Sequence, residues 1–103
     1  MSEQKVVNDI LDLVVRDGLN SFAIKYHGTA TGRGGVPDLI GSWRGRPFAI
    51  EVKKTGQETK GLSLLQVAWL RRFGNGGYVV GVVSSNQDFL NLFLPIDKNE
   101  KSV

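Results

Sequence analysis

The run Tyr78-Val79-Val80-Gly81-Val82-Val83 is the feature that most constrains how this chain folds. Its β-branched side chains leave no polar position that could face water, which is typical of a strand covered on both faces. Helices are the elements that cover both faces of such a strand. The run therefore predicts an α/β protein with a mixed central sheet flanked by helices.

Three segments have the composition of the flanking helices. The first begins at Ser2 or Glu3 and ends before Gly18, which supplies a left-handed stop. Its apolar residues recur at the three-to-four spacing of a buried helical stripe: Val6, Val7, Ile10, Leu11 and Val14. Ser63 and Asn86 begin the second and third helices.

Three further strands are expected at residues 22–26, 36–43 and 47–53. Arg44-Gly45-Arg46 turns the second of these strands back on the third. The predicted order is αβββαβα, and 103 residues make one domain spanning 1–103.

Composition excludes several classes of site. With no cysteine, the chain cannot build disulfide frameworks, thiol nucleophiles or thiolate zinc sites, and it fits a reducing compartment. Its single histidine, His27, excludes sites that need two imidazoles, and we interpret it as a surface residue. The first residues lack the apolar core of a signal peptide. We therefore expect a soluble intracellular protein that acts in the cytoplasm.

Positive charge is concentrated between residues 33 and 72, where the net charge is +5 and the flanks together carry −2. Such an excess attracts phosphate backbones, although a merely solvated surface has the same composition. The glycine-rich loop 28–35 lacks the ending of a nucleotide-binding P-loop, but it would let Arg33 approach DNA closely. The candidate DNA-binding residues are Arg33, Arg44, Arg46, Lys54, Lys60, Arg71 and Arg72.

Asp38, Glu51 and Lys53 are the candidate chemical groups. Side chains alternate along a strand, so Glu51 and Lys53 project from one face, and a hairpin turning near residue 45 pairs Asp38 with Glu51. Two carboxylates and the backbone carbonyl of Val52 would make an oxygen-only site suited to Mg²⁺ or Mn²⁺. The competing interpretations are a surface ion pair for Glu51 and Lys53 and a turn residue for Asp38.

The string Gly35-Val36-Pro37-Asp38-Leu39-Ile40, followed by Glu51-Val52-Lys53 and then Leu62-Ser63-x-x-Gln66, resembles the PD-(D/E)xK nuclease superfamily. Within it, the pattern is most similar to small stand-alone viral and bacterial members of the VRR-NUC family. The resemblance implies a restriction-endonuclease-like αβββαβ core with a further helix. It also implies metal-dependent, structure-selective cleavage of DNA by a homodimer similar to Holliday-junction resolvases.

The same resemblance implies roles for individual residues. Asp38 and Glu51 become metal ligands, Lys53 the catalytic lysine and Gln66 a polar residue that steadies the site. Glu3 matches an acid that could bind a second metal or activate water. Two local alternatives stay open: Ser63 and Gln66 also form a capping box, and a carboxylate at position 3 also suits a helix dipole.

Two functions from different classes follow. The leading hypothesis is a dimeric, metal-dependent junction endonuclease, with a flap or other-structure nuclease of the same fold as a variant of it. The other is a non-catalytic nucleic-acid-binding module that uses the basic segment. We expect Trp43, Trp69, Phe73 and Tyr78 in the core, and part of the apolar segment 89–94 at a dimer interface.

Overall fold

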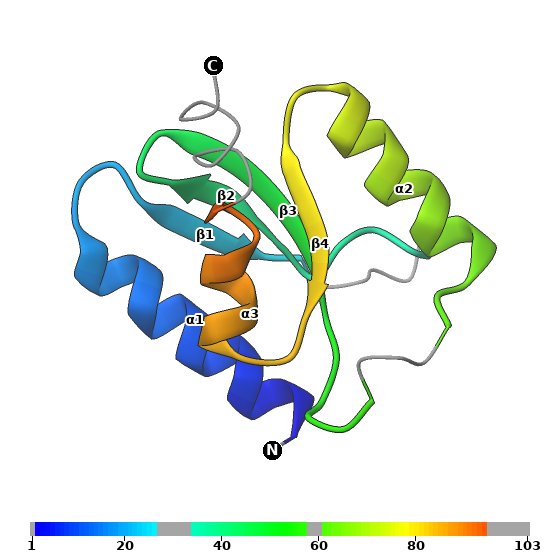
Figure 1. Cartoon of the computed structure of the whole chain (residues 1–103), viewed down its shortest axis with the longest axis horizontal. Coiled ribbons are helices and arrows are strands. Elements are labelled where there is room, and N and C mark those ends of the chain that lie inside the picture. The colour runs from blue at the N-terminus through cyan, green and yellow to red at the C-terminus, as the bar shows by residue number, and fades with distance from the viewer. Residues whose placement is uncertain (1, 27–33, 58–60, 95–103) are drawn as a thin grey trace.

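The computed structural model describes residues 2–26, 34–57 and 61–94. Its elements follow the predicted order αβββαβα (Figure 1). They are α1 (Glu3–Asp17), β1 (Phe22–Lys25), β2 (Leu39–Trp43), β3 (Arg46–Val52), α2 (Leu64–Asn75), β4 (Val79–Val83) and α3 (Asn86–Asn91).

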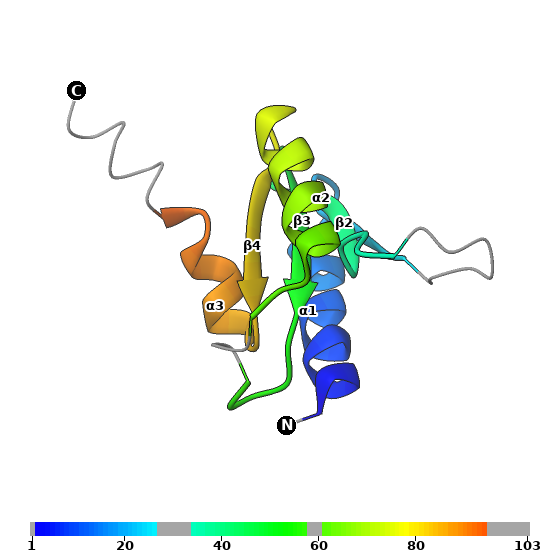
Figure 2. The ribbon, with the colours of Figure 1, turned by 90° about the vertical axis from the view of Figure 1, so that its right-hand side faces the viewer.

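The four strands form one mixed sheet in the order β1-β2-β3-β4. β1 pairs with β2 and β2 with β3 in antiparallel fashion, whereas β3 and β4 are parallel. Helices α1 and α3 lie together on one face of the sheet, and α2 lies on the other (Figure 1 and Figure 2). The predicted mixed sheet between helices is therefore confirmed.

Helix α1 begins and ends where its capping residues predict. The Ser2 side chain accepts a hydrogen bond from the backbone N–H of Lys5, and Gly18 ends the helix with a φ of 113°. That positive φ favours glycine, because residues with a side chain rarely adopt this backbone conformation. The buried stripe consists of Val6, Val7, Ile10 and Val14.

The main core lies between the sheet and the pair α1 and α3. Alternate residues of β3 enter it, namely Phe48, Ile50 and Val52. Phe48 and Phe89 meet edge to face with ring centroids 5.0 Å apart. The ring centroids of Trp43 and Phe89 are 5.5 Å apart, also edge to face. Edge-to-face pairs of this kind add to the stability that burial alone provides.

Most of the apolar segment 89–94 belongs to this same core. Phe89 and Phe93 are buried, and Leu90 and Leu92 pack against the core as partly buried residues. Leu94 is 49% exposed. Phe89 on α3 and Phe93 just after it both pack against Phe48 and Trp43. The predicted dimer interface in part of this segment stays a prediction. A dimer interface there would have Leu94 as its exposed apolar residue.

The β2–β3 hairpin has the tight turn expected from its sequence. Arg44 and Gly45 both have positive φ, 50° and 84°, as a two-residue hairpin turn of the right twist requires. Strand β2 begins at Leu39, three residues later than predicted, and its pairing runs from Trp43–Arg46 to Leu39–Ile50. Continued by one residue, this register places Asp38 opposite Glu51, as predicted.

The α2 side of the sheet is covered less completely. No residue of α2 is buried, and the first four residues of β4 are half-buried. Trp43 is buried as predicted, but Trp69, Phe73 and Tyr78 are half-buried and lie outside the main core. Their predicted core position was wrong, because α2 is the one described helix on this face and nothing described packs over its outer side. None of the described helices is long and apolar enough to span a membrane.

Candidate active site

Asp38 lies where β2 begins, and two hydrogen bonds fix it there. Its Oδ2 atom accepts a hydrogen bond from the backbone N–H of Val52 at 2.8 Å, and its backbone carbonyl accepts one from the N–H of Tyr26 at 2.9 Å. The side chain thus continues the β2–β3 pairing by one step beyond the last backbone pair. One carboxylate oxygen of Asp38 is therefore held by the backbone of β3.

Glu51 is the buried acid of the site. It is 5% exposed and shares the α2 face of the sheet with Asp38. Burial, followed by hydrogen bonding to Asp38 and repulsion from its charge, raises the pKa of Glu51 to about 9. Its Oε2 atom is buried without a hydrogen-bond partner in the described part of the chain. A buried carboxylate of this kind is costly unless a positive charge meets it.

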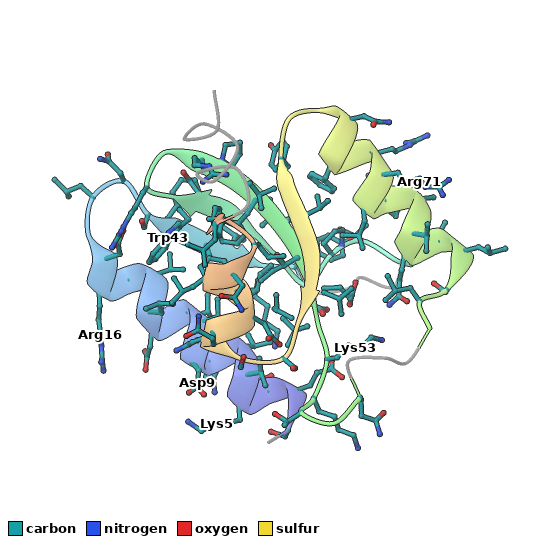
Figure 3. All side chains as sticks on the ribbon, viewed as in Figure 1. Lys5, Asp9, Arg16, Trp43, Lys53 and Arg71 are labelled. Atoms are coloured by element: carbon teal, nitrogen blue, oxygen red, sulfur yellow. The ribbon has the colours of Figure 1, made fainter. Side chains whose placement is uncertain are left out.

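Lys53 follows two residues later on the same face. It is half-buried, and its charge lowers the pKa of Glu51, partly offsetting the effects that raise it. The backbone N–H of Lys53 donates to the carbonyl of Val83 at 2.9 Å, so the parallel pairing with β4 holds the residue in place. Figure 3 shows Lys53 beyond the end of β4, on the side of the sheet that carries α2.

The donor set suits a hard divalent cation. Asp38, Glu51 and the Val52 carbonyl are all oxygen donors, and the unpartnered oxygen of Glu51 is where a cation would compensate charge. Over residues 2–26, 34–57 and 61–94, no three His, Cys, Asp or Glu side chains gather closely enough to hold a metal. A cation would therefore need the backbone carbonyl and water in addition to the two carboxylates.

Glu3 lies at the first residue of α1 and is exposed. Its charge makes the smallest of the contributions that raise the pKa of Glu51. The two carboxylates therefore interact weakly through their charges and do not form a cluster. A role for Glu3 in metal binding stays a prediction.

Gln66 takes the local role that its sequence allows. Its side-chain carbonyl accepts a hydrogen bond from the backbone N–H of Ser63 at 2.8 Å, and its own N–H donates to the Ser63 hydroxyl at 3.1 Å. This reciprocal pair is a capping box at the start of α2. A catalytic role for Gln66 is a prediction that the cap neither requires nor excludes.

Gly35 brings the start of α2 against the segment that leads to Asp38. A Cβ built on Gly35 would lie 2.7 Å from the carbonyl carbon of Leu65 and 2.8 Å from the nitrogen of Gln66. Such contacts are closer than side-chain atoms tolerate, so the two backbones touch because the residue is glycine. No separate role was assigned to Gly35 from the sequence. The sequence feature that could have indicated one is its position in the string Gly35-Val36-Pro37-Asp38.

A solved structure named "VRR_NUC domain protein" superimposes on this chain with a TM-score of 0.67. The match covers 91% of this chain and 86% of the other, at 18% sequence identity. The chain has the restriction-endonuclease-like fold. No protein-family model matches the sequence, and no curated protein matches it.

Within this restriction-endonuclease-like fold, two of the predicted DNA-binding arginines lie far from the acids. Arg44 and Arg46 flank the β2–β3 turn, at the opposite end of the hairpin from Asp38 and Glu51. Arg44 donates twice to Asp17, at 2.8 and 2.9 Å, and Arg46 donates to the carbonyl of Phe93 at 3.2 Å. These contacts tie the turn to the last residue of α1 and to the segment that follows α3.

The remaining basic candidates divide into two groups. Lys54 is exposed beside Lys53, and Arg71 and Arg72 are exposed on α2, where Figure 3 shows Arg71 pointing away from the sheet. Arg33 and Lys60, like His27 and most of the glycine-rich loop, lie outside the described residues.

Proposed function

We propose that this chain is a single-domain, metal-dependent endonuclease that hydrolyses phosphodiester bonds in branched DNA. The observation that carries the proposal is the pairing of Asp38 with the buried Glu51 at one end of β3, with Lys53 on the same face. Buried acids with strongly raised pKa values gather at functional sites, since a fold gains no stability from them. The likeness to a VRR_NUC domain structure supports the same assignment.

The residues of the site divide the proposed chemistry among them. Mg²⁺ or Mn²⁺, when bound, would polarise the phosphate and lower the pKa of a water molecule. Asp38 and Glu51 would hold that ion, and Glu51 would give up its proton when the ion binds. Lys53 would donate a hydrogen bond to the phosphate oxygen on which negative charge develops. The first turn of α2 would hold the segment before Asp38 in place through Gly35.

The decisive experiment incubates the protein with labelled four-way junction, flap, linear duplex and RNA in Mn²⁺ or Mg²⁺, with a chelator as control. We expect metal-dependent nicks near the branch of the four-way junction. Preferential cutting of the flap would keep the nuclease and change its substrate. Binding that weakens with salt and yields no product in any metal would favour a nucleic-acid-binding module instead.

We also propose that the enzyme acts as a homodimer, which matches two active sites to the two strands cut in a symmetric junction. Phe22 and Ile24 of the edge strand β1 are 55% and 66% exposed and share one face of the sheet. An edge strand that pairs with its own copy in antiparallel fashion generates a two-fold axis, so we assign the contact to this strand. Ile24→Glu should then convert a dimer to a monomer in light scattering, and an unchanged mass would contradict the assignment.

A further inference from the structure

A small aromatic hollow lies beside α2, away from the acids. It has a volume of about 140 Å³, and its lining residues are Trp69, Arg72, Phe73 and Tyr78. The first three lie at i, i+3 and i+4 on the helix, so they share one side of it. Tyr78 comes from the residue that leads into β4.

The rings of this hollow pack on one another. Trp69 and Phe73 have centroids 6.1 Å apart, and Phe73 meets Tyr78 edge to face at 5.0 Å. The guanidinium carbon of Arg72 lies 5.5 Å from the centroid of the Trp69 ring. All three rings are half-buried rather than enclosed, so part of their surface faces solvent.

Charge around the hollow favours an anionic ligand with an aromatic part. Helix α2 carries Arg71 and Arg72 and no acidic residue. Nucleic acids combine a phosphate backbone with flat rings, and proteins bind their unpaired strands by stacking bases on aromatic side chains beside basic ones. A hollow of this volume suits one flat ring and is smaller than ordinary small-molecule pockets.

The hollow also lies within reach of the proposed active site. Glu51 pairs with Val82 across the parallel strands, and Tyr78 precedes Val82 by four residues. At about 3.3 Å per residue, the two sites are separated by about 13 Å along the strands, which corresponds to about four nucleotides in a B-form strand. Both lie on the α2 side of the sheet, and α2 runs between them, with Gln66 in its first turn and Phe73 in its last.

From these observations we infer that the hollow binds an unpaired nucleobase of the DNA substrate, a few nucleotides from the bond that is cut. The inference rests on the proposed nuclease function, and it deepens that function by naming what the enzyme recognises. A base is free to leave the stack at a branch point but not within an intact duplex, so this contact would favour branched DNA. Trp69 supplies the stacking surface, and Arg72 holds both the ring of Trp69 and a neighbouring phosphate.

The test measures binding without catalysis. In chelator, the protein is titrated with a fluorescein-labelled twelve-nucleotide oligothymidylate and with an oligomer of the same length whose central four nucleotides are abasic. Stacking contributes about fivefold to a hundredfold in affinity per base, so the intact oligomer should bind tighter by at least that lower factor. Trp69→Ala should remove the difference between the two oligomers, and Trp69→Phe should restore much of it.

Two further measurements separate stacking from charge and folding. Leu64→Ala removes a side chain that is 90% exposed on the same helix, and it should leave the preference for the intact oligomer unchanged. In Trp43→Phe protein, Trp69 is the one remaining tryptophan, and its fluorescence should be quenched by the intact oligomer and not by the abasic one. Circular dichroism of each variant reports that the fold is kept.

The inference is overturned if the wild-type protein binds both oligomers equally, or if Trp69→Ala keeps the preference. It is also overturned if Trp69→Ala changes the oligomeric mass instead, which would make the hollow a contact between copies. Failure of this inference and failure of the proposed nuclease function give different results. If the protein cuts junctions but binds both oligomers equally, only the base-binding inference is wrong. If it prefers the intact oligomer but cuts no substrate in any metal, the proposed nuclease function is wrong.

Discussion

The carboxylate of Asp38 and the backbone N–H of Val52 are joined by a hydrogen bond of 2.8 Å. This contact fastens the residue before β2 to the last residue of β3, and it holds Asp38 beside Glu51 whether or not a cation is present. Asp38 therefore has a structural task, accepting a hydrogen bond, and a proposed chemical task that needs its negative charge. Substitutions can separate the two.

Asp38→Asn keeps an oxygen that can accept from Val52 but removes the charge. We expect this variant to unfold in urea at a concentration close to that of the wild type, because the amide oxygen keeps the hydrogen bond from the Val52 N–H. Junction cleavage in Mn²⁺ should fall by about a hundredfold or more, because a neutral amide is a poor ligand for a hard cation.

Asp38→Ala is the matched comparison. It leaves the Val52 N–H without its partner, which costs about 1–3 kcal/mol of stability, and it should be equally inactive. Cleavage by Asp38→Asn at the wild-type rate would contradict the assignment of Asp38 as a metal ligand.

The raised pKa of Glu51 predicts how the stability of the metal-free protein depends on pH. The unfolded chain releases this proton near the usual glutamate pKa of about 4.3, whereas the folded protein keeps it until about pH 9. Between these values the folded state binds more protons, so the free energy of unfolding falls as pH rises. The fall from this group cannot exceed about 1.4 kcal/mol per pH unit.

Glu51→Gln removes this group and provides the control. In chelator, urea denaturation from pH 5 to pH 9 should show the wild type losing stability relative to Glu51→Gln across that range. Adding Mg²⁺ should restore stability to the wild type, most strongly at high pH, because the ion replaces the proton. Parallel curves for the two proteins would mean that Glu51 titrates normally.

The hairpin that carries the acids was predictable from sequence because its determinants are local. The Arg44-Gly45 turn sets the register, and the strict alternation of side chains then places Glu51 on the same face as Lys53 and opposite Asp38. The same holds for α1, whose cap and apolar stripe lie within a few residues of each other. Both elements could therefore be predicted without information on contacts between residues far apart in the sequence.

What sequence could not predict depends on which surfaces remain uncovered after folding. The aromatic residues of α2 have core-like spacing, but a single helix on that face leaves Trp69 and Phe73 half-exposed. Arg44 was predicted to contact DNA, but in the folded protein it donates to Asp17, a residue 27 positions earlier in the chain. The close contact between Gly35 and the backbone of α2 is likewise a long-range contact, and no local sequence pattern predicts it.

The close contact between Gly35 and the backbone of α2 predicts that alanine substitutions at Gly34 and Gly35 differ in their effect on stability. Gly35 has a φ of 84° and no room for a Cβ against Leu65, so Gly35→Ala should cost about 2–4 kcal/mol in urea denaturation. Because the clash displaces the segment that leads to Asp38, cleavage per folded molecule should fall as well. At Gly34 a Cβ would lie 3.4 Å from the end of the Leu65 side chain, and Gly34→Ala should change stability by less than about 0.5 kcal/mol. Equal effects of the two would refute the contact.

The capping box at the start of α2 allows the two roles of Gln66 to be separated. Ser63→Ala and Gln66→Ala each remove half of the reciprocal pair, so each should cost about 1 kcal/mol in thermal or urea unfolding. If Gln66 also steadies the site, Gln66→Ala should slow junction cleavage by tenfold or more, while Ser63→Ala slows it less than threefold. The comparison is made well below the melting temperature and with saturating Mn²⁺, so that loss of the cap alone does not limit the rate. Equal rates in the two variants would assign Gln66 to the cap and leave Asp38, Glu51 and Lys53 as the chemical groups.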